Sequence, residues 1–103
     1  MREIDVHQLE ELMAAGTAVI DVREPAEFAE AHVPGAVLIP MDQLSARIGE
    51  LDKNSPVHLI CRSGHRSAVM GELLEAEGFD TVNVAGGTLA WVRAGKPFEG
   101  GSE

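Results

Sequence analysis

The sequence predicts an α/β layer fold built on a mainly parallel sheet. Short apolar segments rich in β-branched residues alternate along the chain with segments whose apolar residues recur at helical spacing. The length of 103 residues suits one domain with a single core. In sheets of this kind ligands bind outside the carboxyl ends of the strands, so we expect a functional site there.

The first half of the chain is expected to begin with a helix. Asp5 and Gln8 form a capping-box pattern at its start, and Gly16 is a natural stop at its end. Pro25 suits the first position of a second, short helix. The elements expected after the first helix are, in order, a strand over 18–22, a helix over 25–31, a strand over 36–39 and a helix over 41–51.

The second half repeats the alternation with two further strands and two further helices. We expect a last short helix capped by Thr88 and stopped by Gly95. The domain then covers residues 1–97, and residues 98–103 are expected to form a flexible tail. The other elements of this half are a strand over 57–60, a helix over 67–77 and a strand over 81–84.

Composition excludes several classes of protein. A formal net charge of −9 argues against binding to nucleic acid or to anionic membrane surfaces, which need a basic surface. No apolar run approaches the ~18 residues of a membrane span, and the first residues lack the apolar region of a signal peptide. The single cysteine, Cys61, cannot form an internal disulfide or a cysteine-pair zinc site. We therefore expect a cytoplasmic protein with no bound metal or cofactor.

Cys61 lies where a predicted strand ends and a helix is about to begin. This position can lower the pKa of a thiol, because a helix N-terminus offers unpaired N–H groups and the positive end of its dipole. Gly64 allows the backbone to curl so that successive N–H groups point inward as an anion nest. The residues after the cysteine are Arg62, Ser63, Gly64, His65, Arg66 and Ser67. Two arginines and a histidine in so acidic a chain indicate a local pocket for a small anion, which the arginine forks would bind.

Other readings of single residues stay open. Cys61 could be a buried packing residue, although such a residue needs no Arg-Ser-Gly-His-Arg-Ser sequence after it. Arg23 could shape the pocket together with Asp21, or form an ion pair with Glu27 that braces a loop. The two remaining candidates are expected to be structural: His32 as a hydrogen-bonded anchor of its loop and Trp91 as a core aromatic residue.

Three blocks of sequence together resemble the rhodanese family in its small single-domain form. They span almost the whole chain, and one departure is Ala31, where the family usually has glycine. The blocks are Asp21-Val22-Arg23-Glu24 with Glu27-Phe28 and His32-Val33-Pro34-Gly35-Ala36, then Cys61-Arg62-Ser63-Gly64-His65-Arg66-Ser67, then Gly86-Gly87 through Trp91 with Ala94-Gly95-Lys96-Pro97.

The resemblance implies a three-layer rhodanese-like domain with a central, mostly parallel sheet of about five strands flanked by helices. It also implies thiosulfate sulfurtransferase activity, in which Cys61 accepts the sulfur as a persulfide. The backbone N–H groups from Arg62 to Ser67 would cradle that persulfide, and Arg62 and Arg66 would guide the anionic donor. Since the chain has no second cysteine, the sulfur must leave to an external acceptor: cyanide, a small thiol or the thiol of an acceptor protein.

Two rival functions remain. Rhodanese-like phosphatases and arsenate reductases resemble this architecture but have a loop longer by one residue, with arginine at the sixth position after the cysteine. Here Arg66 is the fifth residue after Cys61, and the smaller ring should favour one sulfur atom over a tetrahedral oxyanion. The second rival is a non-catalytic regulatory rhodanese module, a class that often lacks the cysteine.

Overall fold

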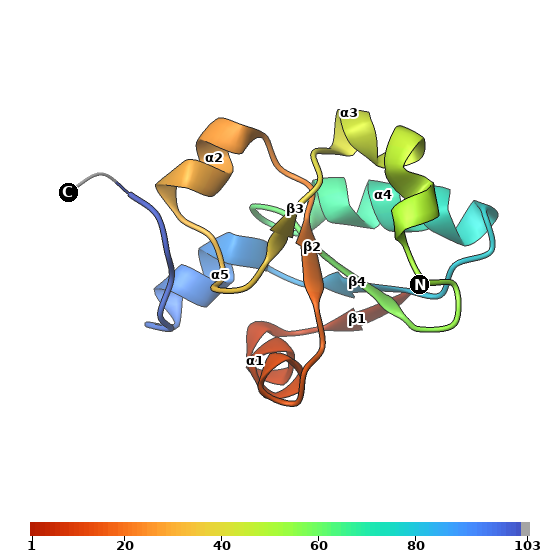
Figure 1. The fold of residues 1–103 in the computed structure, drawn as a ribbon. Coiled ribbons are helices and arrows are strands. Elements are labelled where there is room, and N and C mark those ends of the chain that lie inside the picture. The colour runs from red at the N-terminus through yellow and green to blue at the C-terminus, as the bar shows by residue number, and fades with distance from the viewer. Residues whose placement is uncertain (102–103) are drawn as a thin grey trace.

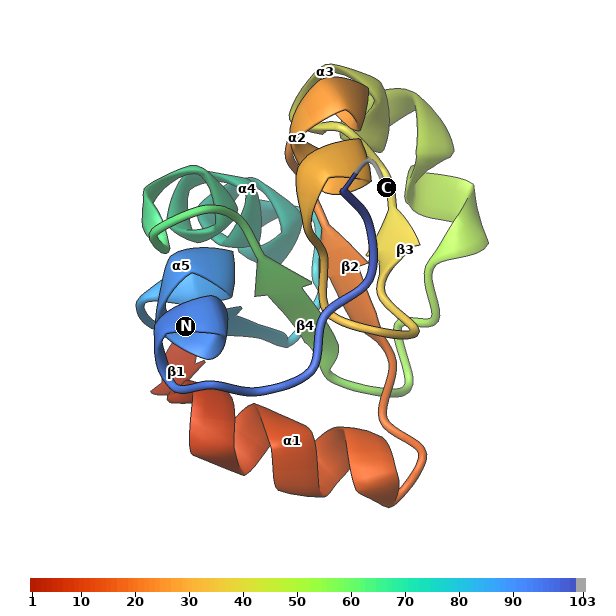
Figure 2. The same cartoon turned by 90° about the vertical axis from the view of Figure 1, so that its left-hand side faces the viewer.

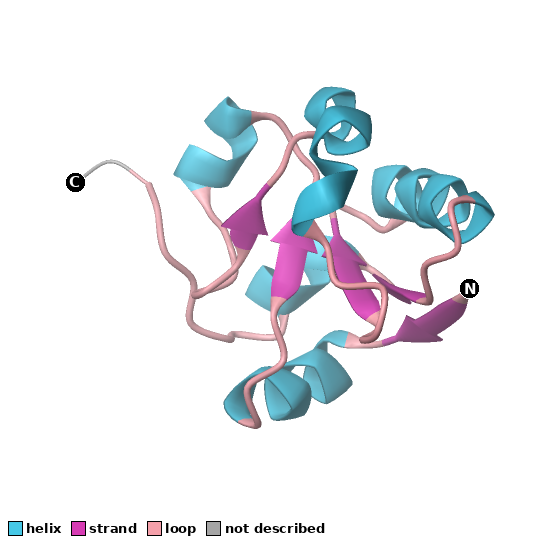
Figure 3. Cartoon of the chain, turned by 45° about the vertical axis from the view of Figure 1, so that its right-hand side comes forward, coloured by secondary structure: helices cyan, strands magenta, loops and turns pink. Residues whose placement is uncertain are grey.

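A computed structural model describes residues 1–101 and shows three layers, with a parallel sheet between two layers of helices (Figures 1 and 3). The sheet has five strands in the order β1-β5-β4-β2-β3, and every neighbouring pair is parallel. This confirms the predicted fold class. The strands are β1 (Arg2–Ile4), β2 (Val19–Asp21), β3 (Val37–Leu38), β4 (Val57–Ile60) and β5 (Thr81–Val84).

The helices cover both faces of the sheet, as Figure 2 shows. Two apolar clusters fill the two interfaces, and β4 contributes to both: Leu59 points to one cluster and Ile60 to the other. Cys61 belongs to the same cluster as Leu59, so the alternation continues past the end of the strand. The helices are α1 (Val6–Ala14), α2 (Pro25–Glu30), α3 (Met41–Leu44), the 3₁₀ helix η1 (Ser45–Glu50), α4 (His65–Ala76) and α5 (Gly87–Arg93).

The predicted start signals of the first two helices are confirmed. The Gln8 backbone N–H donates to the Asp5 carboxylate at 2.8 Å, and the Gln8 side chain accepts from the Asp5 N–H at 2.9 Å, which completes the capping box of α1. Pro25 occupies the first turn of α2. Both helices begin within one residue of the expected position because these signals act locally.

The sequence analysis missed the strand β1. It has three residues, largely exposed, and offers no apolar alternation to detect. Its pairing partner is β5, where Glu3 lies opposite Asn83. Only a partner some 80 residues away makes these residues a strand.

Three helix predictions need correction. The helix expected over 41–51 is a short α3 followed by η1, in which Gly49 weakens α-helical geometry and the tighter 3₁₀ form takes over. The helix expected to begin at Ser67 begins at His65, with Gly64 as its cap. Gly86, not Thr88, caps α5.

The C-terminal segment runs from α5 toward α2 (Figure 2). The N–H of His32 donates to the carbonyl of Glu99 at 2.8 Å, the N–H of Glu99 donates back at 2.9 Å, and Gly101 donates to Ala29. Flexibility of a tail from Phe98 stays a prediction, but its backbone is hydrogen-bonded through Gly101. The tail's last two residues, 102 and 103, lie outside the described part of the chain.

Two smaller predictions in this region are confirmed. The ring of His32 bonds to the carbonyl of Phe28 at 2.7 Å and so anchors its loop. Trp91 is buried in the core, with its indole N–H donating to the carbonyl of Pro97. Within residues 1–101 we find no helix with the length and apolar character that a membrane crossing demands.

Candidate active site around Cys61

Cys61 follows β4, the central strand of the sheet, and stands just before the N-terminus of α4. The turn between them needs Gly64, whose φ of 100° lies in the left-handed region that favours glycine. This backbone conformation reverses the chain tightly enough to aim the Gly64 N–H back at the cysteine. Cys61 therefore lies just outside the carboxyl end of a strand, where parallel sheets of this kind bind their ligands.

Donors of the loop surround the Cys61 sulfur. The Gly64 N–H donates to Sγ at 3.1 Å, and the Ser67 hydroxyl oxygen lies 3.3 Å from Sγ. Burial raises the pKa of the Cys61 thiol, since the side chain is almost entirely enclosed. Hydrogen bonds from the Ser67 hydroxyl and from backbone N–H groups of the loop outweigh that effect, and the pKa of Cys61 lies below its ordinary value.

We expect the thiolate of Cys61 to form at lower pH than that of an ordinary cysteine. Its absorbance near 240 nm, followed against pH in the folded protein, should rise with a midpoint below the ~8.5 of a free thiol. The same protein in denaturant, where the hydrogen bonds are gone, is the matched control. Equal titration midpoints of Cys61 in the folded and the unfolded protein would show that the hydrogen-bond donors of the loop do not lower its pKa.

The Arg66 side chain is already bound to a carboxylate. Its two terminal nitrogens each donate to one oxygen of Glu27 in α2, both at 2.7 Å. The hydrogen bonds from Arg66 outweigh partial burial and hold the pKa of Glu27 at about 2, so the pair stays ionised in all but strong acid. Arg66 thus links α2 to the first turn of α4, and the carboxylate of Glu27 largely neutralises its positive charge.

A second, buried ion pair also helps to position α2. Arg23 donates to the Asp21 carboxylate, at 2.7 Å in the shortest of three side-chain contacts, and both residues are enclosed. Arg23 also donates to the carbonyls of Ala31 and Glu27. The predicted ion pair between Arg23 and Glu27 is wrong. Arg23 pairs with Asp21, and the carboxylate of Glu27 binds Arg66.

The start of α5 supports the cysteine from the opposite side. The Thr88 N–H donates to the carbonyl of Cys61 at 2.8 Å, and the Leu89 N–H donates to the carbonyl of Arg62 at 3.0 Å. Gly87 lets the two backbones approach this closely, because an added Cβ would stand 2.3 Å from the Cys61 carbonyl oxygen. The Gly86-Gly87 pair of the third sequence block therefore allows the start of α5 to pack against the backbone of Cys61 and Arg62.

The structure brings only part of the expected loop onto the sulfur. Gly64 and Ser67 contact Sγ, whereas Arg66 turns to Glu27. The side chains of Arg62, Ser63 and His65 are exposed.

The sequence analysis overlooked Asn83, which bonds to both Ser67 and Gly64 from β5. A polar residue within the apolar segment Thr81-Val82-Asn83-Val84 was the available signal.

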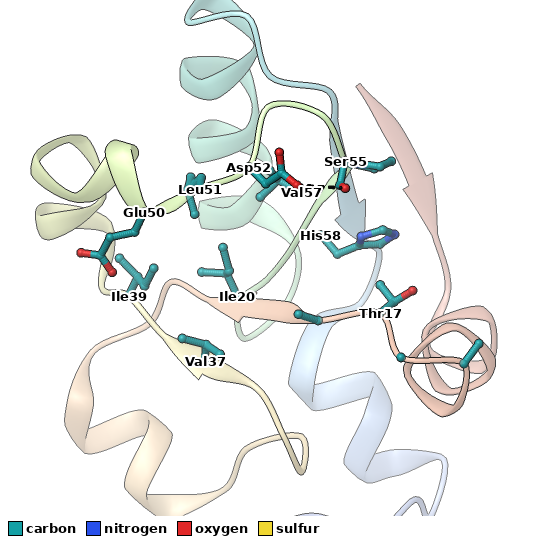
Figure 4. A pocket seen from close by; sticks show the side chains of 14 residues that line it. Thr17, Ile20, Val37, Ile39, Glu50, Leu51, Asp52, Ser55, Val57 and His58 are labelled. Atoms are coloured by element: carbon teal, nitrogen blue, oxygen red, sulfur yellow. Dashed lines mark hydrogen bonds between the residues drawn. The ribbon is translucent and has the colours of Figure 1, made fainter.

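A small cavity adjoins this loop, and a larger one lies elsewhere. The small cavity, of about 220 Å³, lies between α2 and α5, with Glu27, Arg62 and Leu89 in its wall. A cavity of about 640 Å³ is lined by the segment that follows α1, by Val37 of β3 and by the segment around Pro56, but by none of residues 61–67 (Figure 4). Within residues 1–101 no three His, Cys, Asp or Glu side chains gather closely enough to hold a metal ion.

In a three-layer α/β domain, a cysteine at a strand–helix junction whose pKa is lowered is a candidate nucleophile. The chain belongs to the family described as the Rhodanese-like domain, which matches residues 5–94. The relatives named as sulfurtransferases support a rhodanese-type sulfurtransferase.

Two curated relatives match nearly end to end. YtwF of Bacillus subtilis, a candidate sulfurtransferase, is 41% identical over 99 residues, covering 94% of this chain and 96% of its own. A protein of Allochromatium vinosum named Sulfurtransferase is 36% identical over 101 residues, covering 95% and 94%.

Solved structures agree with the fold. A rhodanese-like domain protein of Staphylococcus aureus, 36% identical, superposes with a TM-score of 0.86 over 99% of this chain and 100% of its own. A thiosulfate sulfurtransferase of Pseudomonas aeruginosa, 28% identical, has a TM-score of 0.85 over 99% of this chain and 21% of its own.

Proposed function

We propose that the protein transfers a sulfane sulfur from thiosulfate, or a similar thiosulfonate donor, to a thiophilic acceptor through a persulfide on Cys61. One observation carries the proposal: the enclosed sulfur of Cys61 accepts hydrogen bonds from Gly64 and Ser67 that lower the pKa of the thiol. Such a thiolate is a ready nucleophile near neutral pH. The likeness to a named thiosulfate sulfurtransferase supports thiosulfate as the donor.

The first half-reaction is a displacement at sulfur. The Cys61 thiolate attacks the outer sulfur of thiosulfate, a new S–S bond forms to Sγ, and the old S–S bond breaks so that its electron pair leaves with sulfite. One negative charge remains on the protein, now on the outer sulfur, where backbone N–H groups of residues 62–67 stabilise it as an oxyanion hole stabilises oxygen.

The second half-reaction removes the sulfur. Cyanide or a thiolate attacks the outer sulfur and Cys61 leaves as a thiolate, which predicts ping-pong kinetics. The sequence has one cysteine, so the acceptor is another molecule, either a small thiol or a protein thiol. A single unpaired thiol also favours a reducing compartment such as the cytoplasm.

The geometry of Arg66 argues against the phosphatase alternative. A phosphoryl group needs an arginine fork with free donors for its oxygens. Here that fork is filled by the carboxylate of Glu27. An outer sulfur atom needs only the backbone N–H groups, which the loop supplies.

The test is an intact mass after incubation with thiosulfate. We expect a gain of one sulfur, about 32 Da, that cyanide reverses and that the Cys61→Ser variant lacks. An aryl phosphate offered in parallel should not be turned over. Phosphate release without a sulfur adduct would refute the sulfurtransferase proposal and favour a phosphatase. If the protein shows neither reaction, the non-catalytic regulatory module is the remaining alternative.

A further inference from the structure

The Ser67 hydroxyl faces two acceptors and has one proton. Its oxygen lies 3.3 Å from the Cys61 sulfur and 2.5 Å from Oδ1 of Asn83. All three side chains are buried, so water does not supply a second donor. A hydroxyl donates one hydrogen bond at a time, and its proton must therefore go either to the sulfur or to the amide.

The orientation of the Asn83 amide is fixed by its neighbours. Its Nδ2 donates to the carbonyl of Gly64 at 3.1 Å and to the carboxylate of Glu3 at 3.0 Å. Both partners only accept, so Nδ2 must face them and Oδ1 must face Ser67. The β1–β5 register, which sets Glu3 opposite Asn83, holds this arrangement.

The preferred partner of the Ser67 proton changes with the charge on Sγ. A thiolate is a strong acceptor and draws the proton, which leaves the buried Oδ1 of Asn83 without its donor. In a thiol or a persulfide, Sγ is neutral and accepts weakly, so the hydroxyl donates to Asn83. The buried Oδ1 of Asn83 thus receives its hydrogen bond from Ser67 only when Sγ carries no charge.

We propose that Asn83 is a positioning residue that favours the sulfur-loaded form of the protein, because it accepts the Ser67 hydroxyl whenever the charge has moved from Sγ to the outer sulfur. The inference rests on the proposed persulfide chemistry and deepens it. The hydrogen bonds of the Asn83 side chain go to Ser67, Gly64 and Glu3 and not to the Cys61 sulfur, so it acts on the sulfur through Ser67. Asn83 makes the Cys61 thiolate slightly less stable. It also favours the persulfide, which then persists until an acceptor arrives.

Charged groups on every side of Cys61 stay the same in this comparison. Arg66 of α4 is paired with Glu27 of α2, and the Asp21–Arg23 pair lies after β2. The loop adds Arg62 and His65, which are exposed, and β1 adds Glu3. An uncharged substitution at position 83 leaves all of these in place, so a shift in the titration of Cys61 reports on hydrogen bonding.

The test compares Asn83→Leu with the unaltered protein in two measurements. The Cys61 thiolate should form about one pH unit lower in the variant, because Ser67 then donates to the sulfur without competition. The persulfide yield at fixed thiosulfate and sulfite should fall about tenfold, since a hydrogen bond that favours the loaded form is lost. Thr81→Val, which also removes a buried polar group from β5 but touches neither Ser67 nor Cys61, should change neither value.

A double-substitution cycle separates this role from a structural one. In a Ser67→Ala background, Asn83→Leu should leave the thiolate midpoint unchanged, since the intermediary hydroxyl is gone. A merely structural Asn83 would disturb Gly64 and raise the midpoint in both backgrounds. If Asn83→Leu does not fold, Asn83→Ala gives a second test: it removes the same acceptor with a smaller side chain and no change of charge, and the thiolate midpoint and the persulfide yield should shift in the same directions.

The inference is overturned if Asn83→Leu raises or leaves unchanged the thiolate midpoint, or if its effect survives in Ser67→Ala. Failure of the proposed function looks different. The unaltered protein then takes up no sulfur from thiosulfate, and this is seen before any variant is made.

Discussion

Replacing Gly87 by alanine is expected to lower the free energy of unfolding by about 3–4 kcal/mol and to abolish persulfide formation. The new Cβ would stand 2.3 Å from the carbonyl oxygen of Cys61 and 2.6 Å from that of Arg62, both rigid backbone atoms. Steric crowding of this kind costs about 1–3 kcal/mol, and the left-handed φ of 58° adds about 1–2 kcal/mol for any residue with a Cβ. Relief requires α5 to move away from the loop and break its two hydrogen bonds to it.

The matched control is Gly95→Ala. Gly95 also has a positive φ, of 77°, but no atom lies within 4 Å of its added Cβ. Only the conformational cost of about 1–2 kcal/mol applies there, and sulfur transfer should persist. Denaturant unfolding together with the mass assay separates the two variants, and equal losses of stability would refute the close approach at Gly87.

Replacing Asp21 by alanine should destabilise the protein by about 3–5 kcal/mol, because it strands the buried guanidinium of Arg23 without a counter-charge. The two side chains are 0% and 5% exposed, and no solvent can take the place of the lost carboxylate. The carbonyls of Ala31 and Glu27 would be the remaining acceptors for Arg23. Since these contacts position α2, the partner of Arg66 should also shift.

An exposed ion pair of similar geometry is the control. Arg47 and Glu50 lie at 2.8 Å with side chains 35% and 56% exposed. Glu50→Ala should leave the free energy of unfolding nearly unchanged, since water screens and replaces the interaction. The double variant Asp21→Val with Arg23→Met should recover part of the loss seen in Asp21→Ala. A double variant less stable than the single one would contradict the stranded charge as the cause.

Local patterns predicted most of the elements and the place of Cys61. The capping box at Asp5 and the glycine at Gly64 act over a few residues, so they can be read from the sequence directly. Two parts of the site could not be predicted in this way. The bond from Arg66 to Glu27 spans 39 positions, and that from Asn83 to Glu3 spans 80. Their partners are set by tertiary packing, which residue spacing does not encode.

The placement of β1 beside β5 has a consequence for biosynthesis. Because β1 pairs with a strand 80 positions later, the sheet cannot be completed while β5 is still inside the ribosome. Long-range pairing of this kind slows folding and leaves β1 without its partner until β5 has emerged. The network that joins Glu3, Asn83, Ser67 and Cys61 therefore cannot form before β5 has emerged, and until then a nascent chain should carry its cysteine without these hydrogen bonds.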